Sequence, residues 1–423
     1  MGKRRVVVTG MGLVSPLGND VETSFKHMIE GKNGIDFITL CDVSDSKVKI
    51  AGEVKNLNFE DFMEKREIRR SDRVTNLALV AADEAYKQSG LKEIKDPYRF
   101  ATYIGSGIGG LTTIYKESKT AIERGQGRIS PFFIPNSIIN MVGAKVGIKY
   151  QAKGGNLPSV TACSAATNAI GEAFRAIRDG YIDLAITGGA EAPINDLGLG
   201  GFSSLKALDF SNDPENASRP FDKTRSGFVI AEGAGILILE TYDHAKKRGA
   251  KILAEIIGYA TTSDAYHMTA PDSNAFGITA CINKAIDDAK IDYRDIGYIN
   301  AHGTSTVLND KLETLGIKNA FKDHAKNLFV SSTKSMTGHA LGAAGAIESI
   351  AVIKALQTSK IPPTIHYHVK DEDCDLNYVT NKSIDKDVTY GMNINIGFGG
   401  QNAAVIFKKG EIIWDYQKKI FKK

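Results

Sequence analysis

The sequence predicts an α/β fold made of two related halves. Short apolar runs of strand length alternate along the chain with longer runs of helical period. This alternation is typical of α/β proteins. Two stretches also resemble each other in order and spacing, which indicates an internal duplication. The chain has 423 residues, of which 42% are hydrophobic and 24% charged, enough for a large fused pair of domains with a sizeable core.

In the first half we expect five buried strands and two helices. The strands are RRVVVTG (4–10), RFATYIGSG (99–107), SVTAC (159–163), LAITGG (184–189) and AGILILE (234–240). The helices are VTNLALVAADEAYKQSG (74–90) and ATNAIGEAFRAIRDG (166–180), each ending at a glycine. The stretch at about 109–155 lacks this rhythm and is broken by prolines, so we interpret it as an insertion that caps or lines a pocket.

The second half repeats this style. Its expected strands are AEIIGYA (254–260), IGYINAHG (296–303), LFVSSTKS (328–335) and VIFKK (405–409), and its helices are FGITACINKAIDDAK (276–290) and GAAGAIESIAVIKALQ (342–357). We therefore expect an N-terminal half at 1–255, a C-terminal half at 256–410 and a tail at 411–423. The tail holds the only tryptophan and is expected to be a loose amphipathic helix or disorder.

The duplication predicts where the chemistry lies. When NLPSVTACSAATNAIG (156–171) is set over NLFVSSTKSMTGHALG (327–342), Cys163 falls on Lys334 and Asn168 on His339. YIGSG (103–107) likewise resembles YINAHG (298–303). Equivalent loops of two such halves would meet near a pseudo-twofold axis, which would bring Cys163, His302 and His339 together.

Composition excludes several classes of function. The net charge of +4 gives no reason to expect nucleic acid, although it permits a local basic patch for an acidic partner. The four cysteines show no CxxC spacing, which argues against disulfides and zinc and favours a reducing compartment. The pair His366 and His368 has nothing nearby to complete a metal site, so we expect no metal. No run of 18 apolar residues exists, so no membrane-spanning helix is expected.

Cys163 is the first candidate for chemistry. A strand leads into it and a helix follows, so its sulfur would lie at a helix N-terminus, where the dipole and free N–H groups favour a thiolate. Small neighbours would permit close approach of a substrate. The alternative is a buried structural cysteine.

Three further segments carry candidates. His302 follows an apolar strand, in front of a Gly/Ser/Thr loop, a common position for functional residues. Lys334 and His339 flank a turn, and Glu348 on the next helix could hold Lys334 or orient a histidine. The GFGG turn around Phe398 would expose backbone N–H groups able to stabilise an oxyanion. The alternatives are a satisfied core histidine, a helix-packing contact and an ordinary tight turn.

Together, TACSAATNAIGEA, NAHGTST, SSTKSMTGHALGAAGAIE and GFGGQN, in this order, resemble the elongating β-ketoacyl-acyl-carrier-protein synthases. The resemblance runs from about residue 3 to 409, and Ile108 in GSGIGG favours the type II members over type I. It implies the thiolase fold, in which two α/β halves with mixed five-stranded sheets form αβαβα layers. It also implies a decarboxylative Claisen condensation that needs no cofactor.

The resemblance implies roles for individual residues. Cys163 would be the acylated nucleophile, His302 and His339 would complete the triad, and Lys334 and Glu348 would act electrostatically and structurally. The backbone of Cys163 and Phe398 would form the oxyanion hole. Thr304 and Thr306 would bind the pantetheine arm of the substrate. Phe202 and Phe398 would gate the site, and Ile108, Phe133 and Ile134 would line the acyl tunnel.

The resemblance also implies partners and a place in the cell. An acidic acyl carrier protein would dock on the basic residues Lys65, Arg66, Arg69, Arg70, Arg128 and Lys206. The enzyme would be a homodimer in the cytoplasm of a bacterium or in an organelle of bacterial origin. The alternatives are a ketosynthase of a polyketide or specialised lipid pathway and a non-catalytic chain-length partner; the presence of Cys163 argues against the latter.

Overall fold

A computed structural model describes residues 2–410, so the interpretation of the tail lies outside the described residues. Nine strands of the described residues form one mixed sheet. In spatial order they are β4 (Phe100–Gly105), β5 (Leu184–Glu191), β6 (Gly233–Thr241), β1 (Val6–Val14), β7 (Ala254–Ser263), β13 (Gln401–Lys409), β12 (Tyr390–Gly397), β8 (Ile296–Asn300) and β9 (Phe329–Ser331).

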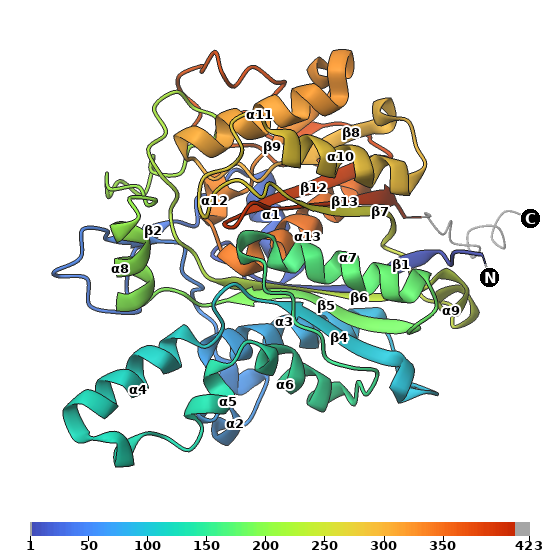
Figure 1. The fold of residues 1–423 in the computed structure, drawn as a ribbon. Helices are drawn as coiled ribbons and strands as arrows, with labels where there is room; N and C mark the ends of the chain where they lie inside the picture. Colours follow the sequence, from blue (N-terminus) through green and yellow to red (C-terminus); the bar gives the residue numbers. More distant parts are fainter. Residues whose placement is uncertain (1, 411–423) are drawn as a thin grey trace, which may run out of the picture.

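The sheet bends around two central helices and gives five layers (Figure 1). Helix α3 (Arg73–Ser89) covers the outer face of β1 and β6. Helices α7 (Ala165–Arg178) and α13 (Ala344–Thr358) pack against each other between the two parts of the sheet. Helices α10 (Phe276–Ala289) and α11 (Val307–Phe321) cover the far side. The predicted α/β fold with an αβαβα arrangement is confirmed.

Burial explains why each helix has its sequence pattern. α13 is buried on almost every side, which fits its nearly continuous run of apolar and small residues. The outer helix α10 buries only one stripe, Ile278, Cys281, Ile282, Ala285 and Ile286. α3 begins at Asp72, whose side chain accepts a hydrogen bond from the backbone N–H of Val74, and ends at Gly90, whose φ of 66° suits the left-handed cap.

The two parts of the sheet share one topology. In the first, β4 runs parallel to β5, β5 antiparallel to β6, and β6 antiparallel to β1. In the second, β8, β12, β13 and β7 repeat these relations in the same order. The internal duplication therefore appears in the strand pairing itself. The division near residue 255 stays a prediction.

The strand count differs from the expected two sheets of five. Residues 6–8 of β1 pair with 254–256 of β7, which joins both parts into a nine-stranded sheet. The predicted strand SVTAC is not formed. Instead, residues 155–159 run beside β4, joined by two backbone hydrogen bonds to Thr102 and one to Ser106 just beyond the strand. This segment precedes α7 as β9 precedes α13, and like β9 it lies at an edge of the sheet.

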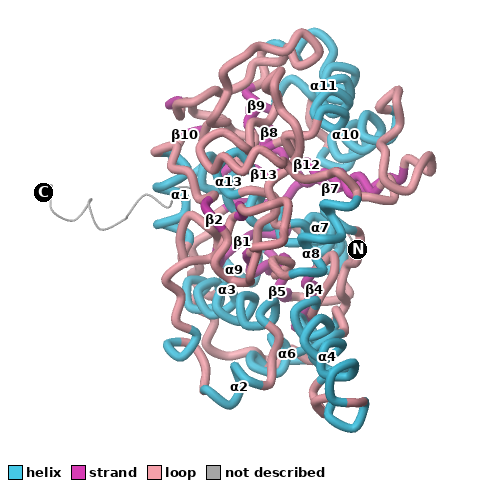
Figure 2. The backbone as a smooth tube through the Cα atoms, turned by 90° about the vertical axis from the view of Figure 1, so that its left-hand side faces the viewer, coloured by secondary structure: helices cyan, strands magenta, loops and turns pink. Residues whose placement is uncertain are grey.

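The stretch at about 109–155 forms helices α4 (Leu111–Arg124), α5 (Phe133–Ser137) and α6 (Asn140–Tyr150). α6 packs on α3 and β4, so it belongs to the outer layer. In the rotated view, α4 lies at the opposite end of the molecule from α11 (Figure 2). Helices α1 (Val21–Ile29), α2 (Lys65–Arg69), α8 (Asp196–Ser204), α9 (Tyr242–Lys247) and α12 (Lys334–Thr337) complete the α-helices, and β2 (Asp36–Phe37) pairs with β3 (Ile50–Ala51), as β10 (Lys360–Ile361) pairs with β11 (Ile384–Asp385).

Among residues 2–410, no helix has both the length and the apolar composition needed to cross a membrane.

The packing of α3 on β1 predicts the effect of one substitution. A Cβ at Gly12 would lie 1.8 Å from the carbonyl oxygen of Ala81. Gly12→Ala should therefore lower the free energy of unfolding by about 2 kcal/mol or more through overpacking, as measured by urea denaturation. Gly200→Ala is the control, because a Cβ there meets nothing within 4 Å. An equal effect of the two substitutions would contradict the close α3–β1 contact.

Candidate active site

Cys163 lies in a 3-10 turn, Ala162–Ser164, that leads directly into α7. Ala162 has a φ of 49°, a left-handed conformation that is costly for a residue with a side chain. The turn abuts the end of β12: a Cβ at Gly397 would lie 2.7 Å from the carbonyl oxygen of Thr161 and 3.2 Å from the backbone nitrogen of Cys163. Glycine thus lets the GFGG turn approach the cysteine backbone.

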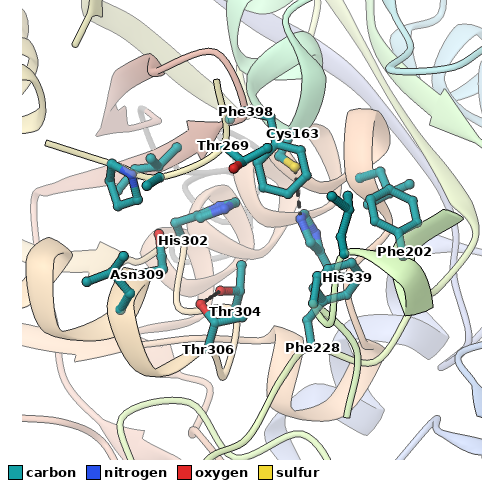
Figure 3. Close-up of a pocket in the computed structure, with 18 of the residues that line it drawn as sticks. Cys163, Phe202, Phe228, Thr269, His302, Thr304, Thr306, Asn309, His339 and Phe398 are labelled. Carbon is teal, nitrogen blue, oxygen red and sulfur yellow. Dashed lines mark hydrogen bonds between the residues drawn. The ribbon is translucent and has the colours of Figure 1, made fainter. Parts of the chain in front are cut away.

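The cysteine faces a cavity of about 380 Å³ that both halves line. Cys163, His302, His339 and Phe398 all border it (Figure 3). Sγ of Cys163 and one ring nitrogen each of His302 and His339 lie within 4.8 Å of one another. The structure therefore brings together the three residues that the duplication predicted to converge.

His339 is held by its backbone and contacts the sulfur through its ring. Its N–H donates to the carbonyl of Val229, and its carbonyl accepts from the N–H of Ala231. Nε2 lies 3.1 Å from Sγ of Cys163. Within the described residues, Nδ1 is buried without a hydrogen-bond partner. No neighbour thus fixes the tautomer, and either ring nitrogen can carry the proton.

His302 lies in a different environment, because its Nδ1 faces only donors. Lys334 Nζ lies 3.4 Å from Nδ1 and Asn395 Nδ2 lies 3.3 Å from it. Lys334 also donates to the His302 carbonyl at 2.6 Å and forms an ion pair with Glu348. Asn395 Nδ2 donates to Glu348 at 2.7 Å, which fixes the orientation of the amide. An ammonium has no lone pair to offer, so Nδ1 accepts and the proton of a neutral His302 lies on Nε2.

The protonation states follow from burial. Burial lowers the pKa of both His302 and His339 well below its usual value, and the Lys334 charge lowers each further. Both rings are therefore neutral at pH 7. Burial raises the pKa of the Cys163 thiol to about 12, against the opposing effect of Lys334. The resting pair is a thiol beside a neutral imidazole, and the helix N-terminus does not by itself produce the thiolate that we expected.

This arrangement can perform acyl transfer. His339 can accept the thiol proton as sulfur attacks a carbonyl carbon. The backbone N–H of Phe398 points at the sulfur, where its hydrogen bond lowers the thiol pKa, so it lies close to any oxyanion formed on an acyl group there. His302 offers a fixed Nε2–H donor from a ring that is 2% exposed. A donor in such a dry site stabilises developing negative charge more than it would in water.

The same three side chains offer one sulfur and two nitrogen ligand atoms, the donor types found in zinc sites. The surroundings of His302 do not fit a metal ligand. A ligating nitrogen must be unprotonated, and the other ring nitrogen normally donates to an acceptor. Here ligation through Nε2 would place the proton on Nδ1, facing the Lys334 ammonium and the Asn395 amide. The residues present suit proton and acyl transfer better than a metal.

Some of the other predicted substrate-binding residues line the cavity and others do not. Thr304, Thr306, Phe202 and Phe398 line the cavity, and the two threonine hydroxyls lie 3.0 Å apart. Ile108 packs in the same apolar cluster as Cys163 and Phe202. Phe133 and Ile134 do not line the cavity described in this single chain, and Ile134 is 60% exposed on α5.

The predicted docking residues lie in three segments. Lys65, Arg66 and Arg69 are exposed on α2, and the guanidinium of Arg70 stacks 4.9 Å from the ring centroid of Phe132, just before α5. Arg128 is exposed between α4 and α5, and Lys206 borders the cavity.

Sequence reasoning missed several polar residues around the site. Asn395 holds Glu348 and faces His302. Glu313 accepts hydrogen bonds from the backbone N–H groups of His302 at 2.6 Å and Gly303 at 2.7 Å. Glu191 is fully buried near Cys163. Asn395 lies in NINIG and Glu191 in TGGAE. In each segment a polar residue near the end of an apolar strand is the sequence feature that could have indicated a functional residue.

Fold and site together define a condensing enzyme of the thiolase fold. Residues 3–245 match the N-terminal domain of the β-ketoacyl synthases and residues 253–368 the C-terminal domain. The chain is 50% identical over 410 residues to a 3-oxoacyl-[acyl-carrier-protein] synthase 2 of Staphylococcus aureus (strain N315), covering 96% of this chain and 99% of the relative. A Synechocystis protein of the same name is 45% identical over 410 residues, covering 96% and 98%.

Among solved structures, the ketosynthase of a type II polyketide synthase, determined with its acyl-carrier protein and bound to a hexaketide, superimposes with a TM-score of 0.89 at 34% identity. The match covers 96% of this chain and 100% of that one. The chain therefore belongs to the β-ketoacyl synthase family.

The raised thiol pKa predicts how Cys163 reacts in the free enzyme. Thiolate is present only as the pH approaches a pKa of about 12, so alkylation by iodoacetamide should accelerate steadily from pH 6 to 10. Peptide mass spectrometry identifies the modified residue, and Cys163→Ser provides the blank. A rate that reaches a plateau below pH 8 would contradict the protonated resting thiol.

Proposed function

We propose that the enzyme extends an acyl chain by decarboxylative Claisen condensation, in fatty-acid elongation. An acyl group on Cys163 reacts with malonyl-acyl carrier protein to give 3-oxoacyl-acyl carrier protein, carbon dioxide and the free thiol. The convergence of one thiol and two neutral imidazoles from opposite halves carries this proposal. Its relatives at 50% and 45% identity are named for this reaction.

The first step transfers the acyl group. His339 Nε2, 3.1 Å from sulfur, takes the thiol proton while sulfur attacks the thioester carbonyl. The backbone N–H groups of Cys163 and Phe398 stabilise the oxyanion. As the tetrahedral intermediate collapses, the bond to the carrier's sulfur breaks and the departing thiolate takes the proton from His339. Lys334 favours negative charge on the sulfur throughout.

The second step generates and uses an enolate. The malonyl carboxylate leaves as carbon dioxide, and its bonding electrons move to the thioester enolate. His302 Nε2–H donates to the enolate oxygen, and His339 donates beside it once its proton lies on Nε2. Together they lower the barrier by roughly 3 kcal/mol or more in a dry site. The enolate carbon attacks the acyl-cysteine, and sulfur leaves as a thiolate that takes up a proton.

The remaining proposals concern carrier docking, the dimer interface and the cellular compartment. The basic residues of α2, with Arg128 and Lys206, form the docking patch for an acidic acyl carrier protein. Leu157 and Val160 are 56% and 52% exposed in the segment that runs along β4 at the edge of the sheet. This exposure supports a homodimer that covers this edge, with Phe133 and Ile134 serving the partner's acyl tunnel. All four cysteines are free, which supports a reducing compartment such as the bacterial cytoplasm.

A polyketide ketosynthase is the second candidate. It is favoured by the structural match to such an enzyme, but at 34% identity rather than 50%. The two candidates differ in the product. A fatty-acid enzyme condenses once on its acyl chain and releases the product for reduction, whereas a polyketide enzyme condenses repeatedly.

The proposal predicts separable defects in the two steps. Cys163→Ala should abolish condensation, because no acyl-enzyme can form. His302→Ala should slow decarboxylation of malonyl carrier by about 10²–10³-fold, the effect of losing one oxyanion donor, and should affect acylation much less. Intact-protein mass and carbon dioxide release measure the two steps separately. Condensation by Cys163→Ala, or equal loss of both steps in His302→Ala, would overturn the assignment.

Charge reversal tests the docking patch. Arg69→Glu with Arg70→Glu should raise the apparent KM for acyl carrier protein about tenfold and leave kcat nearly unchanged, because rim charges act mainly on encounter. Acyl-pantetheine, which lacks the carrier, should be used equally well by the variant and the wild type. A change in kcat alone would place carrier docking elsewhere.

A further inference from the structure

Glu191 is a buried carboxylate for which the mechanism above has no role. It ends β5 and is 0% exposed. Its Oε2 accepts from the backbone N–H groups of Gly107 at 2.6 Å and Gly342 at 2.9 Å. Its Oε1 accepts from the hydroxyl of Ser106 at 2.9 Å and the N–H of Ile108 at 3.2 Å. Four donors match the four lone pairs of the carboxylate oxygens. Burial raises the pKa of Glu191, and these hydrogen bonds offset only part of that rise.

These donors belong to two separate turns. Ser106, Gly107 and Ile108 leave the end of β4 in the N-terminal half. Gly342 lies in the 3-10 turn Leu341–Ala343 of the C-terminal half, just after His339. Glu191 therefore joins a turn of one half to the histidine-bearing segment of the other.

The packing around Glu191 requires both glycines. A Cβ at Gly107 would lie 2.9 Å from Oε2 of Glu191. A Cβ at Gly342 would lie 2.6 Å from the same oxygen and 2.2 Å from the backbone nitrogen of Gly107. The two turns approach so closely that only the carboxylate oxygens fit between their N–H groups.

The residues beside these amides form an apolar wall next to the nucleophile. Ile108 and Leu341 belong to one apolar cluster with Cys163 and Phe202. Leu341 also lines the cavity, with a φ of 44° that its turn imposes. Glu191 thus holds Ile108 directly, and Leu341 through the adjacent Gly342, from behind.

We propose that Glu191 is a positioning residue that sets acyl-chain selection, by clamping the Ile108 turn to the Leu341 turn and so fixing two walls beside the sulfur. This inference rests on the proposed function, since it assigns the apolar cluster to the acyl chain. Glu191 acts through the two turns and does not touch the substrate.

Glu191→Gln changes the hydrogen bonds of this side chain and keeps its volume nearly unchanged. Glutamine has nearly the same shape, but one oxygen becomes an NH₂ group, which cannot accept from an N–H donor. Whichever oxygen is replaced, at least one buried backbone N–H loses its acceptor, and movement of its turn relieves that loss. Ser106→Ala is a milder second variant, since it removes one donor and leaves the carboxylate.

The experiment measures acylation of Cys163 by acyl-pantetheine thioesters of graded length, followed by intact-protein mass. Wild type should show a defined preference in the acylation rate constant against length. Glu191→Gln should change the ratio of the acylation rate constants for the longest and shortest chains about tenfold. Ser106→Ala should change this ratio in the same direction by less.

Glu240→Gln is the matched control. Glu240 is also 0% exposed and holds the side chains of Thr9, His244 and Arg248, away from the cavity. Its variant should lose thermal stability and keep the wild-type length preference. An unchanged preference in both Glu191→Gln and Ser106→Ala would overturn the inference, as would an equal shift in Glu240→Gln. Failure of wild type to be acylated would instead overturn the proposed function beneath it.

Discussion

The buried contact of Lys334 with Glu348 and His302 is the interaction on which the rest of the site depends. An ammonium has three protons, and Lys334 directs them to the Glu348 carboxylate, the His302 carbonyl and His302 Nδ1. Taking such charges out of water is costly unless each is paired and hydrogen-bonded, and here Asn395 adds a further bond to Glu348. This network makes His302 a permanent donor, whereas His339, with an unpartnered Nδ1, is free to exchange its proton with the thiol. Two histidines of similar burial thus acquire different tasks from their neighbours.

The duplicated fold explains how these residues meet. The turns Ala162–Ser164 and Leu341–Ala343 are equivalent in the two halves, and each leads directly into a central helix, α7 or α13. Because α7 and α13 pack together between the two parts of the sheet, their N-terminal ends lie side by side. A thiol from one half therefore lies next to two imidazoles from the other, and the strands that follow supply the GFGG turn and Glu191. The chemistry resides at the junction, where neither half alone provides both nucleophile and donors.

Much of this was accessible from sequence, for reasons that the structure clarifies. The strand and helix patterns were strong because β1, β5, β6 and α13 are buried throughout. The repeat correctly predicted that Cys163, His302 and His339 converge, but its alignment of Cys163 with Lys334 was wrong, because the turn before α7 corresponds to the turn before α13 and places Gly342 opposite Cys163. SVTAC was wrongly predicted as a strand because the chain leaves the sheet edge after Ser159 and enters the 3-10 turn Ala162–Ser164, which composition alone does not reveal. The state of the Cys163 thiol was misjudged as well, since burial opposes the helix N-terminus and cannot be weighed from neighbouring residues. Asn395 and Glu191 were overlooked because their partners, Glu348 and Gly342, are distant in sequence.

The position of one hydrogen atom tests the account most directly. Neutron diffraction from crystals of the unliganded enzyme exchanged into D₂O near neutral pH would locate the deuterium on each imidazole ring. The network around Lys334 predicts deuterium on Nε2 of His302 and none on its Nδ1. Deuterium on Nδ1, alone or together with Nε2, would mean that Lys334 and Asn395 do not direct this ring, and it would contradict the assignment of His302 as the fixed, neutral donor.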